Sequence, residues 1–353
     1  MKVLIINTTR YTINGIANVI VSIINNLKKE NLDLEFTLTC NTFFADSYKS
    51  ILENKVSIVN IPPRKKLFKY MNSLKKMAGD YDIIHVHGNS YTMLLELVAL
   101  RKHLKKVIIH GHATKCSHPK IHSMFKGFLT KLSKNRVACS EDAGKFLYSK
   151  NFDVLPNGID LNKFVFSEEN RSALRKENDL EDKLVFLHIG SCAPQKNQKF
   201  LIDVIKSIPS DDKCFIFLGD GPQKQELLDM ISEEERKYIR FLGAKSDAER
   251  YYSMADFFVL PSIHESFGLV LLEAQINGVP CIASNTISKS SLVINDLVTY
   301  IPLEKEVWVE RLQLLIPQLR KKVDLKLFEN FDITTTSKRV YKYYLKIHES
   351  KEN

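Results

Sequence analysis

Two glutamates with seven residues between them, Glu265 and Glu273, are the first candidates for chemistry in this chain. The apolar run 256–260 before them predicts a buried strand, and a helical pattern begins near Phe267. Glu265 is therefore expected in the loop after a strand, and Glu273 in the first two turns of the next helix. The N–H groups at a helix start attract phosphate, and carboxylates beside them can hold sugar hydroxyls. The segment predicts such a binding site, although two glutamates at this spacing are also common on solvated helices.

Four histidines form two pairs, His85 with His87 and His110 with His112, and each pair belongs to a predicted strand or its end. Residues two apart on a strand project to one face of its sheet. A metal site built from the four imidazoles is one interpretation. No carboxylate or cysteine nearby completes a metal-binding motif, so we predict that no metal is bound. The alternative is a set of polar strand ends that local hydrogen bonds satisfy.

The segment 63–77 combines basic and apolar residues. Its apolar residues Leu67, Met71 and Leu74 fall on one face of a helix, and the basic residues around them are Arg64, Lys65, Lys66, Lys69, Lys75 and Lys76. Such a helix can lie in the interface of an anionic membrane, where each lysine contributes roughly 1 kcal/mol. It can equally pack its apolar face into the core and leave its lysines in water.

The elements that must position these residues follow a βαβ pattern, which predicts an α/β protein with doubly wound parallel sheets. Short β-branched runs alternate with stretches of helical periodicity. The predicted strands are 2–7, 34–40, 56–60, 82–87, 106–112, 135–139 and 152–155 in the first half, and 183–190, 213–218, 239–242, 256–260, 279–284 and 298–301 in the second. Ligands of such sheets bind beyond the carboxyl ends of the strands, so functional residues are expected in the loops that follow them.

The chain has 353 residues, about twice the length of one ordinary domain, and its composition of 44% hydrophobic and 26% charged residues is that of a folded protein. The segment 155–160 combines a proline with an Asn-Gly turn signal and is the predicted interdomain connection. We expect an N-terminal domain over 1–158, a C-terminal domain over 159–333, and a helix within 334–353 that packs back toward the N-terminal domain.

The positive charge lies in the first half of the chain. Residues 1–158 hold 24 lysines and arginines against 11 acidic residues, a net charge of +13, whereas residues 159–353 carry −3. A one-sided field suits an anionic partner such as a membrane surface, a phosphorylated lipid carrier or a nucleic acid. A well-solvated, lysine-rich surface is the alternative.

Apolar stretches are all shorter than the roughly 18–20 residues that span a bilayer, and the N-terminus reads as a strand without the features of a secretory signal. We therefore expect a cytoplasmic protein, with peripheral contact to the inner face of the cell membrane. The cysteines are scattered and are expected to be reduced and mostly buried; they are Cys40, Cys116, Cys139, Cys192, Cys214 and Cys281.

The chain resembles the family 4 retaining glycosyltransferases. Glu265 and Glu273 resemble the E-x7-E motif of that family, the segment 155–164 resembles its V-x-N-G-[VI]-D-x-x-x-F connection, and the run from Gly190 to Lys196 resembles its G-R-x-x-x-x-K phosphate loop. The resemblance covers nearly the whole chain. Within the family it is similar to enzymes that build bacterial capsular polysaccharide or exopolysaccharide.

This resemblance implies a GT-B fold, in which two Rossmann-like domains face a central cleft. It implies an N-terminal domain on the acceptor side and a C-terminal domain that binds the nucleotide-sugar. The implied activity is that of a retaining, metal-independent hexosyltransferase, which moves a sugar from a UDP-sugar to a glycan or lipid-linked glycan acceptor. No cofactor is expected besides this co-substrate, and no nucleic acid partner.

Site residues carried over from the family fall in the loops and strand ends named above. Lys196 is expected to bind the donor diphosphate without the usual arginine, because Ser191 follows Gly190. A lysine binds phosphate as a point charge, without the bidentate geometry of a guanidinium. Glu265 is expected to hold sugar hydroxyls and Glu273 the ribose.

The catalytic assignment is His112, Glu265 and Lys196. His112 is the better match to the family's histidine that faces the donor sugar, with His110 second. The remaining donor-binding residues are Gly15, in a turn where Asn14 replaces the first of two glycines, and the helix start at Ser266, Phe267, Gly268 and Leu269.

Two other functions remain open on the sequence. A nucleotide-sugar epimerase of the same architecture would bind the donor but would need neither an acceptor nor a basic face. A non-catalytic partner subunit, which Ser191 suggests, would keep the fold without turnover.

Overall fold

The computed structural model describes the chain except for residues 10, 12–14, 31, 41–43, 210–211 and 351–353. The chain divides into two compact units. The first comprises Met1–Asp160 and Glu329–Asn353, and the second comprises Leu161–Phe328. The sequence predicts domain boundaries after residues 158 and 333, and the units of the structure change after Asp160 and after Phe328. The chain thus enters the second unit near the predicted connection and returns to the first unit just before the last helix.

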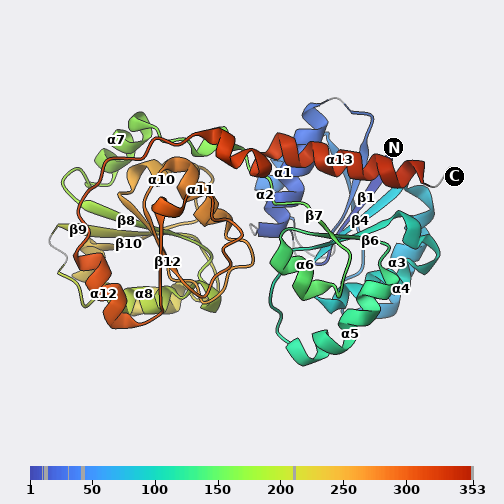
Figure 1. Cartoon of the computed structure of the whole chain (residues 1–353), viewed down its shortest axis with the longest axis horizontal. Helices are drawn as coiled ribbons and strands as arrows, with labels where there is room; N and C mark the ends of the chain where they lie inside the picture. The colour runs from blue at the N-terminus through green and yellow to red at the C-terminus, as the bar shows by residue number, and fades with distance from the viewer. Residues whose placement is uncertain (10, 12–14, 31, 41–43, 210–211, 351–353) are drawn as a thin grey trace. The chain divides into compact units, whose positions relative to one another are not determined.

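The first unit is built on a seven-stranded parallel sheet of order β3-β2-β1-β4-β5-β6-β7 (Figure 1). Its strands are β1 (Lys2–Asn7), β2 (Glu35–Cys40), β3 (Val56–Asn60), β4 (Ile83–Gly88), β5 (Val107–Gly111), β6 (Asn135–Ala138) and β7 (Asp153–Val154). All four interior residues Val3–Ile6 of β1 are buried, as expected for a strand that helices cover on both faces.

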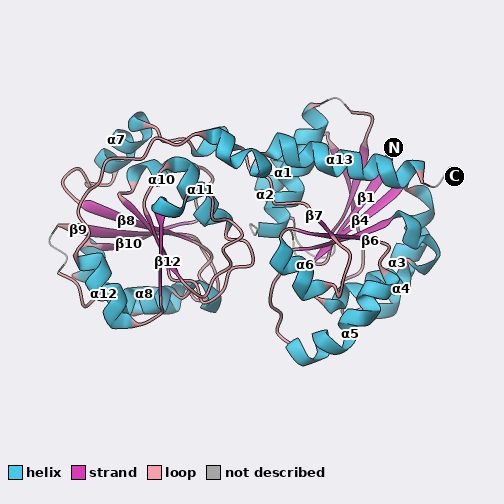
Figure 2. Cartoon of the chain, in the orientation of Figure 1, coloured by secondary structure: helices cyan, strands magenta, loops and turns pink. Residues whose placement is uncertain are grey.

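Helices cover both faces of this sheet (Figure 2). They are α1 (Gly15–Lys29), α2 (Asp46–Leu52), α3 (Leu67–Met77), α4 (Leu94–Ala99), α5 (Pro119–Leu132), α6 (Glu141–Leu147) and α13 (Ile333–Glu349). The last helix, α13, packs along α1 and against β4, while α3, α4 and α5 contact one another in sequence order (Figure 1). Residues from the end of the chain therefore complete the core of the first unit.

The second unit holds a six-stranded parallel sheet of order β10-β9-β8-β11-β12-β13. Its strands are β8 (Leu184–Ile189), β9 (Lys213–Leu218), β10 (Ile239–Gly243), β11 (Phe257–Leu260), β12 (Cys281–Ser284) and β13 (Val298–Ile301). The helices are α7 (Glu168–Glu177), α8 (Gln198–Ile205), α9 (Lys224–Asp229), α10 (Glu249–Met254), α11 (Leu269–Asn277) and α12 (Lys305–Gln313).

Two apolar cores lie on the two faces of this second sheet. One packs α10 and α11 against it, and the other packs α8 and α12, with Trp308 fully buried. Asp256, at the start of β11, accepts bonds from Arg171 and Arg175 of α7 and from the Val185 N–H of β8. This buried cluster ties α7 and two strands together.

Each sheet reverses its strand order once, between β1 and β4 in the first unit and between β8 and β11 in the second. Ligands of doubly wound sheets bind at such switch points, outside the carboxyl ends of the strands. The predicted fold of two Rossmann-like parallel-sheet domains is confirmed, and each predicted strand is present within a few residues of its expected bounds.

The six cysteines are free, and only Cys116 is not fully buried. Within the part of the chain that the structure describes, none of the helices is both long enough and apolar enough to cross a bilayer.

Candidate functional site

The loops after β8 and β11 lie together at the switch point of the second sheet, because these two strands are neighbours. The first loop contains Gly190 to Asn197 and the second contains Pro261 to Gly268. The N–H of Ile263 donates to the Gln195 carbonyl at 2.9 Å, and the Asn197 amide donates to the Pro261 carbonyl at 3.1 Å. These bonds fix the relative position of the two loops that carry the predicted phosphate-binding and E-x7-E residues.

Lys196 and Glu265 form an ion pair across these loops. Nζ of Lys196 lies 2.5 Å from Oε1 of Glu265, and both side chains are 12% exposed. The Ser262 hydroxyl donates to the same carboxylate oxygen at 2.9 Å. The structure thus brings together two of the three predicted catalytic residues, each as the other's partner.

Gly190 in the first loop leaves room for the Lys196 side chain, because glycine has no Cβ. A Cβ added to Gly190 would lie 3.1 Å from Cδ of Lys196, so the lysine stem passes directly over the glycine. Ser191 is exposed, and its carbonyl accepts a bond from the Gln198 side chain at 2.9 Å. The position of the missing arginine therefore carries no charge.

The start of α11 lies at Leu269, two residues later than predicted, because Gly268 adopts a left-handed conformation with φ of 79°. Phe267 is buried and Ser266 is partly buried. The hydroxyl of Ser291, which is fully buried, has no hydrogen-bond partner among the described residues and lies 3.2 Å from the place of a Cβ on Gly268. A helix start with free N–H groups and a nearby hydroxyl can bind an anion.

Glu273, in the second turn of α11, accepts a hydrogen bond of 2.6 Å from the Tyr252 hydroxyl through Oε2. Burial raises the pKa of Glu273 to about 7, while the Tyr252 bond and the charge of Lys196 oppose that shift. Glu273 is consequently only partly ionised at neutral pH. Sequence reasoning missed Tyr252, since nothing in its local sequence on α10 distinguishes it from a core tyrosine.

His188 was also missed as a neighbour of this site. It lies on β8 two residues before Gly190, so its spacing to the phosphate loop was the available signal. The Nδ1–H donates to the Val259 carbonyl at 2.9 Å, and the buried Nε2 meets no hydrogen-bond partner in the described part of the chain. Burial lowers the pKa of His188 to about 4, so it is a neutral acceptor at physiological pH.

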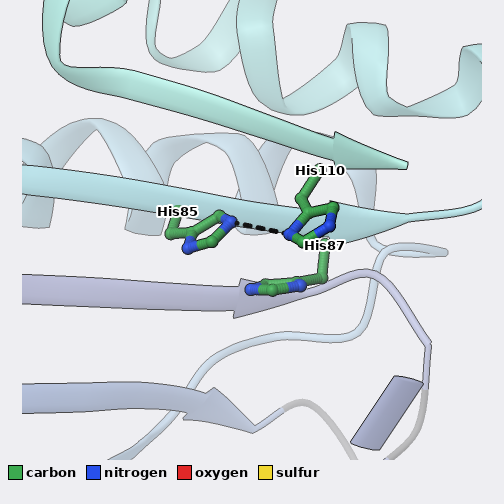
Figure 3. A group of neighbouring side chains, drawn as sticks. All are labelled: His85, His87 and His110. Carbon is green, nitrogen blue, oxygen red and sulfur yellow. Dashed lines mark hydrogen bonds between the residues drawn. The ribbon is translucent and has the colours of Figure 1, made fainter. Parts of the chain in front are cut away.

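His85, His87, His110 and His112 of the first unit form a stacked row along β4 and along β5 and its end. His87 pairs in register with His110, and residues two apart share a face. His85 Nε2 lies 3.2 Å from His110 Nδ1 (Figure 3), and His87 Nδ1 lies 3.0 Å from His112 Nε2. Within the row, His112 is the most exposed, at 8%, and burial lowers its pKa to about 4 while Asn157 raises it.

Gly15 begins α1 and is exposed, and no described atom lies within 4 Å of an added Cβ. Nothing in its described surroundings requires glycine. Asn14, its predicted partner in the turn, lies outside the described residues.

The segment 63–77 packs only part of its apolar residues into the core. On α3, Tyr70 and Leu74 are buried, and the Tyr70 hydroxyl donates to Glu96 of α4 at 2.7 Å. Phe68 is 86% exposed and Leu67 is also exposed. The helix therefore packs through one face and leaves apolar side chains in solvent on another.

Two family models match the chain and together span most of it. "Glycosyltransferase Family 4" matches residues 13–163, and "Glycosyl transferases group 1" matches residues 170–322.

Curated relatives include UDP-Gal:alpha-D-GlcNAc-diphosphoundecaprenol alpha-1,3-galactosyltransferase of Escherichia coli, which is 29% identical over 67% of this chain and 65% of its own length. The putative glycosyltransferase EpsF of Bacillus subtilis is 29% identical over 68% of this chain and 67% of its own length. The matched part thus spans about two thirds of these relatives.

Solved structures share the fold. Anabaena HepE in complex with UDP and glucose superposes with a TM-score of 0.78 at 19% identity, covering 97% of this chain and 99% of that one. Sucrose-phosphate synthase from Thermosynechococcus elongatus gives 0.77 at 16% identity, covering 99% of both chains.

Proposed function

We propose that this chain is a family 4 glycosyltransferase that transfers a sugar with retention from a UDP-sugar to a glycan or lipid-linked glycan acceptor in surface polysaccharide biosynthesis. The observation that carries the proposal is the meeting of Lys196 and Glu265 at the switch point of the second sheet, beside the start of α11. The relatives, which act in polysaccharide and lipid-linked glycan synthesis by their names, support the acceptor class.

In this proposal the second unit binds the donor diphosphate between Lys196 and the start of α11. A diphosphate that reaches Lys196 must compete with Glu265, whose carboxylate then becomes available to the sugar hydroxyls. Ser262 keeps a hydrogen bond to Glu265 and limits how far that carboxylate moves. Positive groups arranged in advance at the leaving diphosphate provide the main electrostatic stabilisation of the transition state.

Glu273 is proposed to hold the ribose. Tyr252 fixes one carboxylate oxygen, Oε2, and orients the other toward a ligand. Ribose hydroxyls donate to a carboxylate, so binding selects the ionised form of Glu273. The donor would therefore lower the pKa of this group from its value of about 7.

His112 of the first unit is proposed to contact the donor sugar. His87 holds its Nε2, and Asn157 lies beside its ring, so the imidazole is oriented before substrate binds. The resemblance to the family implies that the leaving phosphate oxygen takes the acceptor proton, and no protein base is assigned. His110 lies deeper, at 1% exposure, and is proposed to support the row rather than to touch the sugar.

The first unit is also proposed to rest on an anionic membrane surface. Exposed apolar residues Leu67 and Phe68 on α3, and Ile121, Met124 and Phe128 on α5, lie among the lysines of a half that carries a net charge of +13. Residues 121, 124 and 128 share one helical face. Apolar side chains with surrounding lysines fit a headgroup interface, and a lipid-linked acceptor would be found there.

Acceptor-dependent UDP release tests the function. The protein is incubated with single UDP-sugars and a membrane fraction, and UDP is measured with and without the membranes. Release that requires the acceptor supports the transferase. Sugar interconversion without acceptor would identify an epimerase, and neither activity with any donor would indicate a non-catalytic partner.

A further inference from the structure

We propose that His85, His87 and His110 form a binding site for one divalent transition-metal ion in the first unit, with Zn²⁺ as the ion best suited to it. These side chains each offer a nitrogen, and the three nitrogens lie within 4.8 Å of one another (Figure 3). The three histidines belong to the first unit and have no part in the leaving-group chemistry proposed above for residues of the second unit.

The sheet brings the three imidazoles together. His85 and His87 are two residues apart on β4, and His110 stands beside His87 in the parallel register with β5. Helices α1 and α13 cover this face, where Ile20, Ile23 and Tyr344 line a small cavity with His85 and His87. The three imidazoles are each no more than 2% exposed, so their backbone positions are fixed by the core around them.

The nitrogen spacing approaches that of a metal site. Zn–N bonds of about 2.0–2.1 Å place two ligands of a tetrahedral ion roughly 3.4 Å apart. His85 Nε2 and His110 Nδ1 are 3.2 Å apart, which fits this value. The widest nitrogen pair is within 4.8 Å, so the rings have to move closer together when the ion binds.

Hydrogen bonds on the far sides of the rings support the same arrangement. His85 Nδ1 contacts the Tyr344 hydroxyl at 2.8 Å, which leaves Nε2 for the ion. His87 Nδ1 contacts His112, which leaves Nε2 of His87. A metal-bound histidine normally donates its other N–H to such a partner, which fixes its tautomer and orientation.

The donor chemistry decides the class of ion. Among the described residues no carboxylate joins the group, so Mg²⁺ and Ca²⁺, which prefer oxygen, are disfavoured. Neutral imidazoles suit Zn²⁺, Ni²⁺ and Cu²⁺. A cavity of about 10 Å³, lined by His85, His87 and Tyr344 but not by His110, has about the room that one water molecule needs.

Binding at His87 has a consequence for its neighbour. With Nε2 on the ion, His87 carries its proton on Nδ1 and donates it to Nε2 of His112. His112 then carries its own proton on Nδ1, next to Asn157. The ion therefore sets the tautomer of the histidine proposed to contact the donor sugar.

The test is metal binding by the full-length protein, purified without a histidine tag and stripped with a chelator. Zn²⁺ is added, the excess is removed by gel filtration, and bound zinc is counted by mass spectrometry. Co²⁺ replaces Zn²⁺ in a parallel sample, whose visible absorption reports tetrahedral nitrogen ligation. We expect one ion per chain for the wild type.

Variants locate the ion. His85→Asn and His87→Asn should lose stoichiometric binding, and Tyr344→Phe should weaken it by about 10- to 100-fold. His122→Asn is the matched control, because His122 is buried in the same unit with both ring nitrogens hydrogen-bonded elsewhere. It should bind like the wild type.

A wild-type protein that retains no zinc, or His87→Asn that binds as well as His122→Asn, would overturn the proposal and leave a hydrogen-bonded row of neutral histidines. Circular dichroism of each stripped variant checks that it is folded. Tyr344→Phe changes one hydroxyl only and serves as the second probe if an Asn variant does not fold. Because the readout is the ion, the result is independent of whether the transferase proposal holds.

Discussion

Nζ of Lys196 lies 2.5 Å from Oε1 of Glu265, so the cation proposed for the donor diphosphate is neutralised by the carboxylate proposed for the sugar. The two groups therefore depend on one another. Removing either one changes the charge of the other's surroundings as well as its own contact with the donor.

Lys196→Ala should weaken binding of free UDP by about tenfold or more, since a hydrogen bond to a charged group contributes roughly 1.5–3 kcal/mol. Glu265→Gln should leave UDP affinity equal to or tighter than that of the wild type, because Lys196 is released, while turnover of the UDP-sugar falls. Calorimetric titration with UDP measures both. Lys199→Ala, which removes an exposed lysine paired with Glu226, is the control. Equal UDP affinity of Lys196→Ala and Lys199→Ala would contradict the assignment.

Ser191→Arg should strengthen UDP binding by about tenfold, the effect of roughly 1.4 kcal/mol. Ser191 is exposed after Gly190, so the longer side chain can be accommodated, and a guanidinium binds phosphate in a bidentate manner. The measurement is UDP affinity by calorimetry at fixed salt. Ser191→Gln, which has similar bulk without charge, is the control; an equal gain from both would assign the effect to packing.

Glu273→Gln should weaken free UDP by about tenfold or more, because a neutral amide replaces the carboxylate that accepts ribose hydroxyls. The wild-type affinity should rise as pH passes through about 7, as Glu273 ionises, and the Glu273→Gln affinity should not. Tyr252→Phe, which keeps the carboxylate, separates orientation from charge. Unchanged UDP affinity in folded Glu273→Gln would remove Glu273 from the donor site.

The same carboxyl predicts how stability depends on pH. Its folded pKa of about 7 lies above the ordinary value of 4.5, so the folded state binds the proton more tightly. Its contribution to stability is present below pH 4.5 and is lost as pH rises toward 7. Thermal unfolding should show Glu273→Gln gaining stability relative to the wild type across that window. If the difference in Tm between Glu273→Gln and the wild type stayed constant across this pH range, Glu273 would not be buried enough to have a raised pKa.

His112→Ala should lower kcat by about tenfold or more while leaving UDP affinity within a factor of two to three, because its proposed contact is the sugar. His110→Ala should lower kcat less, since His110 is more deeply buried in the row than His112. Steady-state kinetics with the active donor, together with UDP titration, provides the comparison. Normal turnover of His112→Ala with inactive His110→Ala would reverse the two roles.

Sedimentation with lipid vesicles tests the membrane surface. Replacing Lys65, Lys66 and Lys69 with Glu should abolish binding to anionic vesicles, and Phe68→Ser or Met124→Ser should weaken it. The wild type and each variant should bind less to neutral vesicles than the wild type binds to anionic ones. The charge-reversal variant should keep its fold, since these three lysines are exposed and Tyr70 and Leu74 still pack. Equal binding to neutral and anionic vesicles would contradict an electrostatic contribution.

The sequence by itself determined the two sheets and the loops that carry the site. Short β-branched runs bury on both faces, so their spacing predicted the strands, and Gly190, Lys196, Glu265 and Glu273 fell in the loops or helices after them. The resemblance then assigned these residues a chemistry. This local information was sufficient to predict the strands and the loops after them, because the periodicity of strands and helices depends on the spacing of apolar residues along the chain.

Only the tertiary structure decided which side chains are partners. Lys196 and Glu265 are 69 positions apart, and Tyr252 reaches Glu273 from another helix. The start of α11 moved to Leu269 because Gly268 takes a positive φ, which helical periodicity does not report. The row of histidines forms a converging group because the parallel register places His110 beside His87 and α13 packs against β4. Contacts of this kind depend on strand order and helix packing, which no local pattern contains.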